Sequence, residues 1–417
     1  MEYWPVRMGC LRPSAVGAGS IMQAGVAALA VFYVMFGCLS FVEMAYLPRY
    51  LAALGIHKEN IGLILGSVTL ARVVAAPLWA KMAEDRQANA LVVRRQATVA
   101  LVVLGLLPFV SSHLGVALLI FLTGTGHGTV MPIADILTIQ TVGLARFGQI
   151  RSAASIGYGV MALGAALLGG AWSHEGISRI APYVLAVTAA GLFVSARFLP
   201  ENVSTVAEQE KVSWKERWEV LTGRALWPLF ILCMFHWMSV VPYNAFLVFL
   251  CEDRGIGASV PGLAVGWGIF CEVLLFLGGA RLVARWGAPR VLVASAIITT
   301  LRWVLTVWWK GAVPLILVQG LHGVTVATFQ IAAMSLLFSR VGPSMRTTAQ
   351  AVFHMMVFGA GGGLGMVLAG QVLAAGGPEQ LFVGAAWLEL VVTVGILWWV
   401  WPRAQASHPA SGIPLEG

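Results

Sequence analysis

Twelve apolar runs, each bounded by charged or turn-forming residues, constrain this chain more than any other feature. An α-helix needs roughly 20 apolar residues to cross the ~30 Å hydrocarbon core of a bilayer, and each run is near that length. The runs lack the period-2 alternation of membrane-barrel strands, so we expect helices. The predicted spans are Ala24 to Leu47, Ile61 to Leu78, Ala97 to Ser112, Leu114 to Ile139, Ala153 to Trp172, Tyr183 to Phe198, Leu226 to Leu250, Gly262 to Leu282, Val291 to Trp309, Val313 to Phe338, Ala349 to Leu373 and Leu381 to Trp401. The sequence therefore predicts an all-α membrane protein with twelve transmembrane helices.

Composition excludes a water-soluble globular enzyme. Of the 417 residues, 59% are hydrophobic and only 11% are charged, whereas soluble domains carry about 25% charged residues. The five cysteines are scattered without CxxC spacing, so we expect neither a disulfide framework nor a metal site, and no cofactor. Neither an HExxH nor a GxSxG motif is present, which disfavours an integral-membrane enzyme.

The distribution of basic residues predicts the topology. Of the 26 Lys and Arg residues, 19 fall in segments on the side of the N-terminus, 5 fall on the opposite side, and 2 lie within spans. Basic loops stay preferentially in the cytoplasm. Both termini are therefore predicted to be cytoplasmic, and the net charge of +8 reflects topology rather than nucleic-acid binding.

The chain divides into two similar halves. We predict a cytoplasmic N-terminal segment (1–23), a six-helix half (24–200), a cytoplasmic linker (201–224), a second six-helix half (225–402) and a disordered cytoplasmic tail (403–417). Gly55-Ile56 recurs as Gly255-Ile256, at an offset of 200, and the fifth and eleventh spans match at an offset of 195, which pairs Arg151 with Arg346 and Gly164 with Gly359. Because matching spans run in the same direction, this is a parallel repeat.

Three ionisable residues of the second half fall at a similar depth in adjacent spans: Glu272, Arg302 and His322. A charge inside a span needs a partner or a water-filled cavity. A carboxylate, a guanidinium and an imidazole at one depth can neutralise each other, and a proton arriving on one of them changes that balance. We interpret them as a proton-coupling set; a static ion-pair network is the alternative.

Arg72 in the second span is the repeat counterpart of Glu272. It could receive an anionic solute or pair with Glu43 or Asp135, and the sequence leaves these possibilities open. Asp135 lies close to the end of its span, which favours a gate or a structural pair. Glu389 in the last span is interpreted as pairing with a neighbouring helix.

Three further histidines, His127, His236 and His354, stand alone on apolar helices, which favours hydrogen-bonded core residues. The neighbours of His236, namely Trp237 and Asn244, make that face of the seventh span a candidate cavity wall.

Several segments carry a family resemblance. They are YLPRYLAALGI (Tyr46 to Ile56), PLWAKMAEDR (Pro77 to Arg86), FGQIRSAASIGYG (Phe147 to Gly159), GIFCEVLLF (Gly268 to Phe276), LRW (Leu301 to Trp303), QGLHGVTVATFQIAA (Gln319 to Ala333) and TTAQAVFHMMVFGAGGGLG (Thr347 to Gly365). The repeat of six plus six spans resembles the major facilitator superfamily, and these segments resemble its phenylpropionate permease family, near the lactose permease and nucleoside:proton symporter branches.

The resemblance implies a solute site between the two halves and alternating access by rocking of one half against the other. By resemblance, Glu272, Arg302 and His322 match an arrangement used for proton coupling in the lactose permease branch. Thr325 stands where that branch has a proton-binding glutamate, so Glu272 is the preferred proton carrier here.

The sequence therefore predicts a monomeric proton-coupled symporter of the bacterial inner membrane that imports a small organic solute, with an aromatic carboxylate such as 3-phenylpropionate favoured. A sugar or nucleoside symporter is the alternative; drug efflux is disfavoured because the fifth span lacks a Gly-Pro pair. The predicted solute-binding residues are Arg72, His236, Trp237, Asn244, Trp267, Gln319 and Gln330, with Phe329 as a further ring beside the solute. The predicted gating residues are Asp85, Arg86, Asp135, Arg151 and Arg346.

Overall fold

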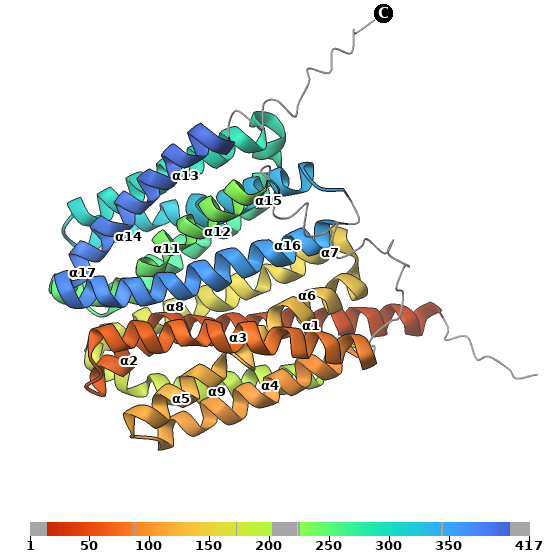
Figure 1. Ribbon diagram of the computed structural model, residues 1–417. Coiled ribbons are helices and arrows are strands. Elements are labelled where there is room, and N and C mark those ends of the chain that lie inside the picture. The colour runs from red at the N-terminus through yellow and green to blue at the C-terminus, as the bar shows by residue number, and fades with distance from the viewer. Residues whose placement is uncertain are drawn as a thin grey trace, which may run out of the picture.

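The chain folds into two packed helical bundles, and no strand occurs among the described residues (Figure 1). The computed structural model describes residues 15–86, 88–171, 173–201, 223, 226–342 and 345–400. The first bundle contains α1 (Ala15–Ala45), α2 (Leu47–Ala53), α3 (Lys58–Arg86), α4 (Asn89–Leu106), η1 (Leu107–Phe109), α5 (His113–Thr123), α6 (His127–Val142), α7 (Leu144–Arg151), α8 (Ala153–Ala171) and α9 (His174–Arg197). The second contains α11 (Trp227–Asp253), α12 (Ser259–Trp286), α13 (Ala288–Trp308), α14 (Ala312–Val318), η2 (Gln319–Leu321), η3 (Val324–Thr328), α15 (Phe329–Ser339), α16 (Arg346–His354), η5 (Met355–Gly361), α17 (Gly362–Gly395) and η6 (Ile396–Val400).

Eleven segments of the described chain are long and apolar enough to cross a membrane. The last of them, Val352–Trp398, has 47 residues, about 70 Å of helix, more than twice the hydrocarbon thickness. Gly377 interrupts it with φ 78° and ψ 179°, a conformation that glycine tolerates and a helix does not contain. The segment therefore comprises two spans, and the fold agrees with the predicted twelve. The described helices mostly extend a few residues beyond the predicted apolar runs, because their polar ends lie outside the hydrocarbon.

The predicted repeat is visible where the first span of each half ends. Gly55 and Gly255 both adopt a positive φ, 82° and 65°. The amide of Ile56 donates to the Leu51 carbonyl and that of Ile256 donates to the Cys251 carbonyl. Both turns are glycine-terminated helix ends of the same type. We call this end of the bundle the distal end, and the opposite end, where α1 begins, the terminal end.

Glycines bring the two halves into close contact on the distal side. A Cβ at Gly62 of α3 would collide with the carbonyl oxygen of Met366 in α17, and one at Gly262 of α12 would collide with that of Ala162 in α8. Only glycine permits such an approach of two helix backbones. The distal end is also bridged by an ion pair between Arg49 of α2 and Glu252 of α11.

These contacts correct one detail of the predicted repeat. If residues 62 and 262 are equivalent, then residues 162 and 366 are equivalent too, which gives the fifth and eleventh spans an offset of 204 rather than 195. Contacts within each half agree, because Gly157 lies against Val34 as Gly361 lies against Met234. The predicted pairing of Arg151 with Arg346 is therefore wrong. Glycines recur so often in both helices that a shifted register also aligns them.

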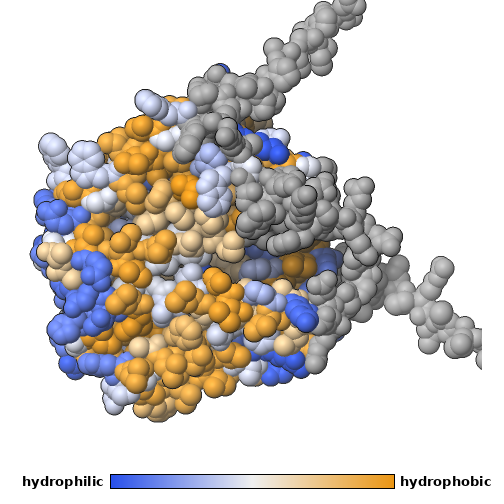
Figure 2. All heavy atoms as spheres, in the orientation of Figure 1, coloured by the Kyte–Doolittle hydropathy of each residue, from blue (hydrophilic) through white to orange (hydrophobic). Residues whose placement is uncertain are grey.

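The outer surface is apolar, as expected for contact with lipid. In Figure 2 an orange hydrophobic face covers the middle of the molecule, and blue residues gather at its distal end. Leu70, Leu167 and Leu277 are among the exposed large side chains. Burying such a surface in hydrocarbon is favourable.

The fourth and tenth spans both lose regular α-helical geometry near the middle. Residues 124–126 separate α5 from α6, and the 3₁₀ and π segments η2 and η3 separate α14 from α15. Irregular turns leave backbone carbonyls free for other partners, and they often mark functional positions in membrane helices. Both breaks lie beside a histidine, His127 and His322.

Candidate functional site

Glu272 and His322 form the first part of the site, near the middle of the second half. Nε2 of His322 lies 3.1 Å from Oε2 of Glu272, and both side chains are almost fully buried. Gly323 permits this, because a Cβ there would lie 2.8 Å from the amide nitrogen of Glu272. The other carboxylate oxygen accepts a 3.3 Å hydrogen bond from Ser155 of α8, in the opposite half. Glu272 therefore contacts groups from both halves.

Arg302 lies nearby but has other partners than the sequence predicted. Its Nε and Nη2 donate to Oε1 of Gln319 at 3.0 and 2.7 Å. Its guanidinium lies 4.2 Å from the centre of the Tyr243 ring and 4.3 Å from that of Trp303, in cation–π geometry. Among the described residues Arg302 makes no ion pair, although it lies within electrostatic range of Glu272. Arg302 is thus a fixed positive charge beside the Glu272–His322 pair rather than a member of it.

Both the oxygen and the nitrogen of the Gln319 carboxamide are hydrogen-bonded. Its oxygen accepts from Arg302, and its Nε2 donates to the Thr306 hydroxyl at 3.2 Å. It is fully buried. This geometry makes Gln319 a holder of Arg302 and disagrees with the predicted solute contact.

A second imidazole–carboxylate pair lies in the same half and was missed by sequence reasoning. Nδ1 of His236 lies 2.8 Å from Oε1 of Glu389, and its Nε2 lies 3.0 Å from the carbonyl oxygen of Thr325. Ser239 donates to Oε2 of Glu389 at 2.6 Å. Phe329 stacks on the imidazole with ring centres 3.5 Å apart. The prediction that Glu389 pairs with a neighbouring helix is confirmed, and so is the prediction that His236 is a hydrogen-bonded core residue.

His236 also lines a pocket together with two other residues that were predicted to bind the solute. Trp237 and Gln330 contribute to its wall, and the other lining residues are Thr325, Val326, Phe329, Phe353, Val357 and Phe358. Trp237 meets Phe358 edge to face, with ring centres 4.6 Å apart. We call this space the aromatic pocket. It offers ring faces and edges and one carboxamide, a surface suited to an aromatic group.

The first half also contains an imidazole–carboxylate pair, in which the carboxylate belongs to Glu43. Nδ1 of His127 lies 2.6 Å from Oε2 of Glu43, and Thr123 donates to its Oε1 at 3.2 Å. Arg72 interacts electrostatically with Glu43. Under the offsets of the repeat, Glu43 and Arg72 correspond to Tyr243 and Glu272.

His127 and His322 are each followed by a glycine that packs against the second span of its own half. A Cβ at Gly128 would lie 3.0 Å from Nε in the Arg72 side chain, and one at Gly323 would lie 2.8 Å from the backbone nitrogen of Glu272. The recurring His-Gly dipeptide was the sequence signal that could have located both pairs.

Asp135 forms an ion pair with Arg151, which both predicted alternatives, a gate and a structural pair, allow. Nε of Arg151 lies 3.3 Å from Oδ1 of Asp135, which also accepts a 2.7 Å hydrogen bond from the Tyr33 hydroxyl. Arg346 lies instead beside the Phe338 ring, with its Cζ 5.7 Å from the ring centre. The side chains of Asp85 and Arg86 lie outside the described residues.

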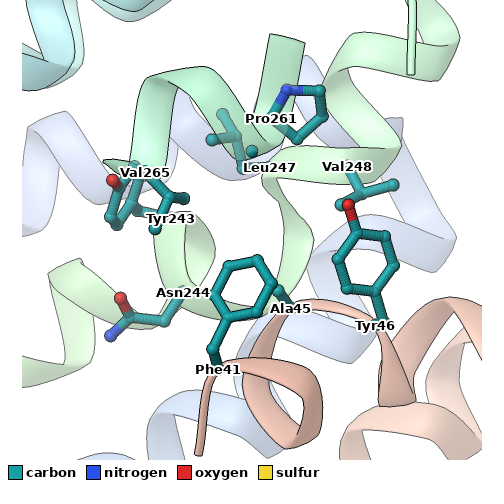
Figure 3. A pocket seen from close by; sticks show the side chains of 10 residues that line it. Phe41, Ala45, Tyr46, Tyr243, Asn244, Leu247, Val248, Pro261 and Val265 are labelled. Atoms are coloured by element: carbon teal, nitrogen blue, oxygen red, sulfur yellow. The ribbon is translucent and has the colours of Figure 1, made fainter. Parts of the chain in front are cut away.

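A separate pocket lies between the halves near the distal end (Figure 3). Phe41, Ala45 and Tyr46 face it from the first half, and Tyr243 and Asn244 face it from α11. Asn244 therefore lies at the contact between halves, apart from the aromatic pocket. Trp267 lies in neither pocket; it is 39% exposed and stacks on the exposed Phe270.

Comparison with known proteins places this architecture. The model of the MFS_1 like family matches residues 27–383. The chain is 25% identical over 353 residues to the "Probable 3-phenylpropionic acid transporter" of Escherichia coli (strain K12), covering 83% of this chain and 89% of that protein. It is 28% identical over 264 residues to the multidrug resistance protein MdtG of Proteus mirabilis (strain HI4320), covering 56% of this chain and 63% of that protein.

Solved structures agree in fold. The nucleoside transporter NupG superposes with a TM-score of 0.76 at 20% identity, covering 89% of this chain and 98% of that one. A bacterial homologue of the human lysosomal transporter Spinster, in an inward-facing and unoccupied conformation, gives 0.68 at 13% identity, with 93% and 97% covered.

These matches and the twelve-span architecture support the predicted superfamily, and the relatives are transporters rather than enzymes. The chain belongs to the MFS_1-like family and is a multi-pass membrane transporter of the major facilitator type.

Proposed function

We propose that this transporter is a proton-coupled symporter that imports a small aromatic carboxylate into the bacterial cytoplasm, with 3-phenylpropionate as the favoured solute. The Glu272–His322 pair carries the proton in this proposal, Arg72 receives the solute carboxylate, and the aromatic pocket receives the ring.

The observation that carries the proposal is the position of Glu272 between the halves. Its carboxylate contacts His322 in its own half and Ser155 in the other. Hydrogen bonds to a charged acceptor are stronger than those to a neutral one. Protonation of Glu272 therefore weakens its link to Ser155 and makes the separation of α8 from α12 easier. That gives proton binding a direct effect on the movement of the halves.

Solute binding rests on two complementary surfaces. Arg72 is a guanidinium in the middle of a span with no hydrogen bond or ion pair to another described residue. A guanidinium binds a carboxylate through two parallel hydrogen bonds. The aromatic pocket, with Trp237 and Phe329 in its wall, suits the ring of the same solute.

The relative from Escherichia coli supports this solute class through its name, "Probable 3-phenylpropionic acid transporter". A sugar or nucleoside would need polar side chains such as those of Gln319, Gln330 and Asn244 to bind its hydroxyl groups. Gln319 is occupied by Arg302 and Asn244 lies at the distal contact, so only Gln330 remains in the aromatic pocket. This distribution favours the carboxylate.

The direction of access follows from the predicted topology. The positive-inside rule puts the terminal end in the cytoplasm, and the halves are joined at the distal end by glycine contacts and by Arg49 with Glu252. In this proposal the structure is closed toward the outside. The Asp135–Arg151 group near the terminal end serves as a cytoplasmic gate that rearranges when the halves rock.

The test measures proton movement in right-side-out vesicles that contain the transporter. Adding 3-phenylpropionate should make the outside medium more alkaline, and an imposed pH gradient should drive its accumulation. Glu272→Gln should abolish both effects but retain exchange of labelled for unlabelled solute, because exchange needs no net proton transfer. The retained exchange shows that the variant is folded.

The matched control is Glu175→Gln, which removes an exposed carboxylate that pairs with Arg179 on its own helix. It should accumulate solute like the wild type. If Glu272→Gln still accumulates 3-phenylpropionate against a gradient, Glu272 is not the proton carrier. If the wild type exchanges the solute without moving protons, the symport mechanism is wrong.

A further inference from the structure

The acid beside Arg72 is Glu43, and its carboxylate is bound by other side chains. This leaves the Arg72 guanidinium available for a ligand. Arg72 and Glu43 interact electrostatically, yet no ion pair within 4 Å joins them in the described structure. The Glu43 carboxylate is instead engaged by His127 at 2.6 Å and by Thr123 at 3.2 Å. The bare backbone of Gly128 lies against Nε of Arg72, so no side chain replaces the missing acid there.

The contact between Glu43 and His127 depends on a proton. When the imidazole is protonated, Nδ1 donates a charge-assisted hydrogen bond to Glu43 and Nε2 can donate to the Ser40 hydroxyl, which lies 3.2 Å away. When it is neutral, only an ordinary hydrogen bond opposes the full charge of Arg72. A carboxylate with two competing partners moves to the stronger one.

We propose that Glu43 and His127 form a proton-operated switch that controls the anion site at Arg72. A proton on His127 holds Glu43 and leaves Arg72 open to the carboxylate of the solute. Loss of that proton lets Glu43 pair with Arg72, and the solute is excluded. The inference rests on the proposed function for the solute, in which Glu272 carries the transported proton. It adds an order of events: His127 binds a proton that permits solute binding and is not itself carried across, before Arg72 binds the solute.

The surroundings leave few other groups to produce this effect. Toward Glu43, α6 contributes His127 and α3 contributes Arg72. The other titratable and charged groups on packed elements include Cys38 of α1 itself, Tyr46, Arg49 of α2, His113 of α5, Asp135 of α6, Arg151 of α7, Tyr158 of α8, Arg197 of α9, and Tyr243, His236 and Glu252 of α11. In the described part of the chain none of these forms a hydrogen bond or ion pair with Glu43, His127 or Arg72.

The first experiment measures the dissociation constant of 3-phenylpropionate by titration calorimetry on the purified transporter in nanodiscs. The wild-type constant should rise at least tenfold from about pH 6 to about pH 8, equivalent to ~1.4 kcal/mol. Glu43→Gln should bind with nearly the same affinity at both values, because no carboxylate then competes for Arg72. A Glu43→Gln protein that keeps the wild-type pH dependence would overturn the switch.

Two further variants separate this inference from the proposed function. Arg72→Gln should weaken binding at both pH values; if it binds like the wild type, the solute assignment at Arg72 fails. Glu175→Gln should retain the wild-type pH dependence.

A solute-free measurement tests the switch even if 3-phenylpropionate does not bind. The infrared difference spectrum between the two pH values should contain a carboxylate band that Glu43→Gln removes and Glu175→Gln retains. If the band survives in Glu43→Gln, the carboxylate of Glu43 does not change partners and the proposal is wrong.

Discussion

Two imidazole–carboxylate pairs in the second half have the same chemistry and very different surroundings. In the Glu389–His236 pair, both ring nitrogens and both carboxylate oxygens have partners, and Ser239 also receives a 3.4 Å hydrogen bond from Trp303. Glu389 has no exposed surface, and all of its partners belong to one half.

The Glu272–His322 pair is looser. It is longer, at 3.1 Å, and Nδ1 of His322 is buried without a hydrogen-bond partner among the described residues. Its remaining contact, from Ser155, crosses to the other half. A saturated pair loses much when its proton or a partner changes, whereas an unsaturated one can exchange protons and partners. From this difference we propose a structural role for the Glu389–His236 pair and a mobile role for the Glu272–His322 pair.

The strongest way to break this comparison is to remove each acid. Glu389→Leu should lower the free energy of unfolding by about 3–5 kcal/mol, because His236 then remains buried without its acceptor. Glu272→Leu should lower the free energy of unfolding by clearly less, because the contacts of Glu272 are longer than those of Glu389. Reversible unfolding in mixed detergent micelles measures both. Equal losses for the two variants would remove the distinction between the pairs.

Removing the hydroxyl that supports Glu389 tests its saturation. Ser239→Ala leaves Oε2 of Glu389 and Nε1 of Trp303 without their partner, and should lower the unfolding free energy by about 1–3 kcal/mol. The same unfolding measurement applies, with Ser111→Ala, a change at an exposed serine of the loop before α5, as control. A negligible loss would mean that the network is less complete than its distances indicate.

Removing the hydroxyl that reaches Glu272 should affect transport more than stability. Ser155→Ala deletes one long hydrogen bond, for which we expect at most about 1 kcal/mol in unfolding free energy. Proton-driven accumulation in vesicles should fall severalfold while exchange is preserved, since the variant loses a contact between halves. An unchanged accumulation ratio would mean that the hydrogen bond from Ser155 does not couple protonation of Glu272 to movement of α8.

The smallest effect is expected at the distal contact between the halves. Arg49→Gln removes a partly exposed ion pair with Glu252, and such pairs contribute about 0–1 kcal/mol. The distal end should open more often, so a cysteine placed by Val248→Cys in the distal pocket should react up to about fivefold faster with an impermeant maleimide. The labelling rate of protein that lacks the Val248→Cys change is subtracted to correct for reaction of the native cysteines. An unchanged labelling rate would mean that the glycine contacts, and not the Arg49–Glu252 ion pair, keep the distal end closed.

The candidate site was predictable only in part. The depth of Glu272 and His322 follows from counting residues along their helices, and their contact is confirmed. Counting also put Arg302 at that depth, yet its partner is Gln319. Depth does not specify the rotation of a helix about its axis, and that rotation decides which neighbour a side chain meets.

The pairs of His127 with Glu43 and of His236 with Glu389 were missed for the same reason. Each joins spans far apart in the chain, and an apolar run contains no information on which distant helix lies beside it. The recurring His-Gly dipeptide was a local signal, but its meaning depends on the neighbouring helix that the glycine admits.

The sequence by itself determined the class of this protein. Twelve apolar runs permit only membrane-spanning helices, because backbone groups in hydrocarbon must be bonded within the helix. The recurrence of Gly55-Ile56 as Gly255-Ile256 indicated the parallel repeat. The tertiary structure alone decided the register of the fifth and eleventh spans, the closure of the distal end and the partner of each buried charge. These depend on how closely two helix backbones approach and on which faces they turn to each other, and both are settled only when all the helices pack together.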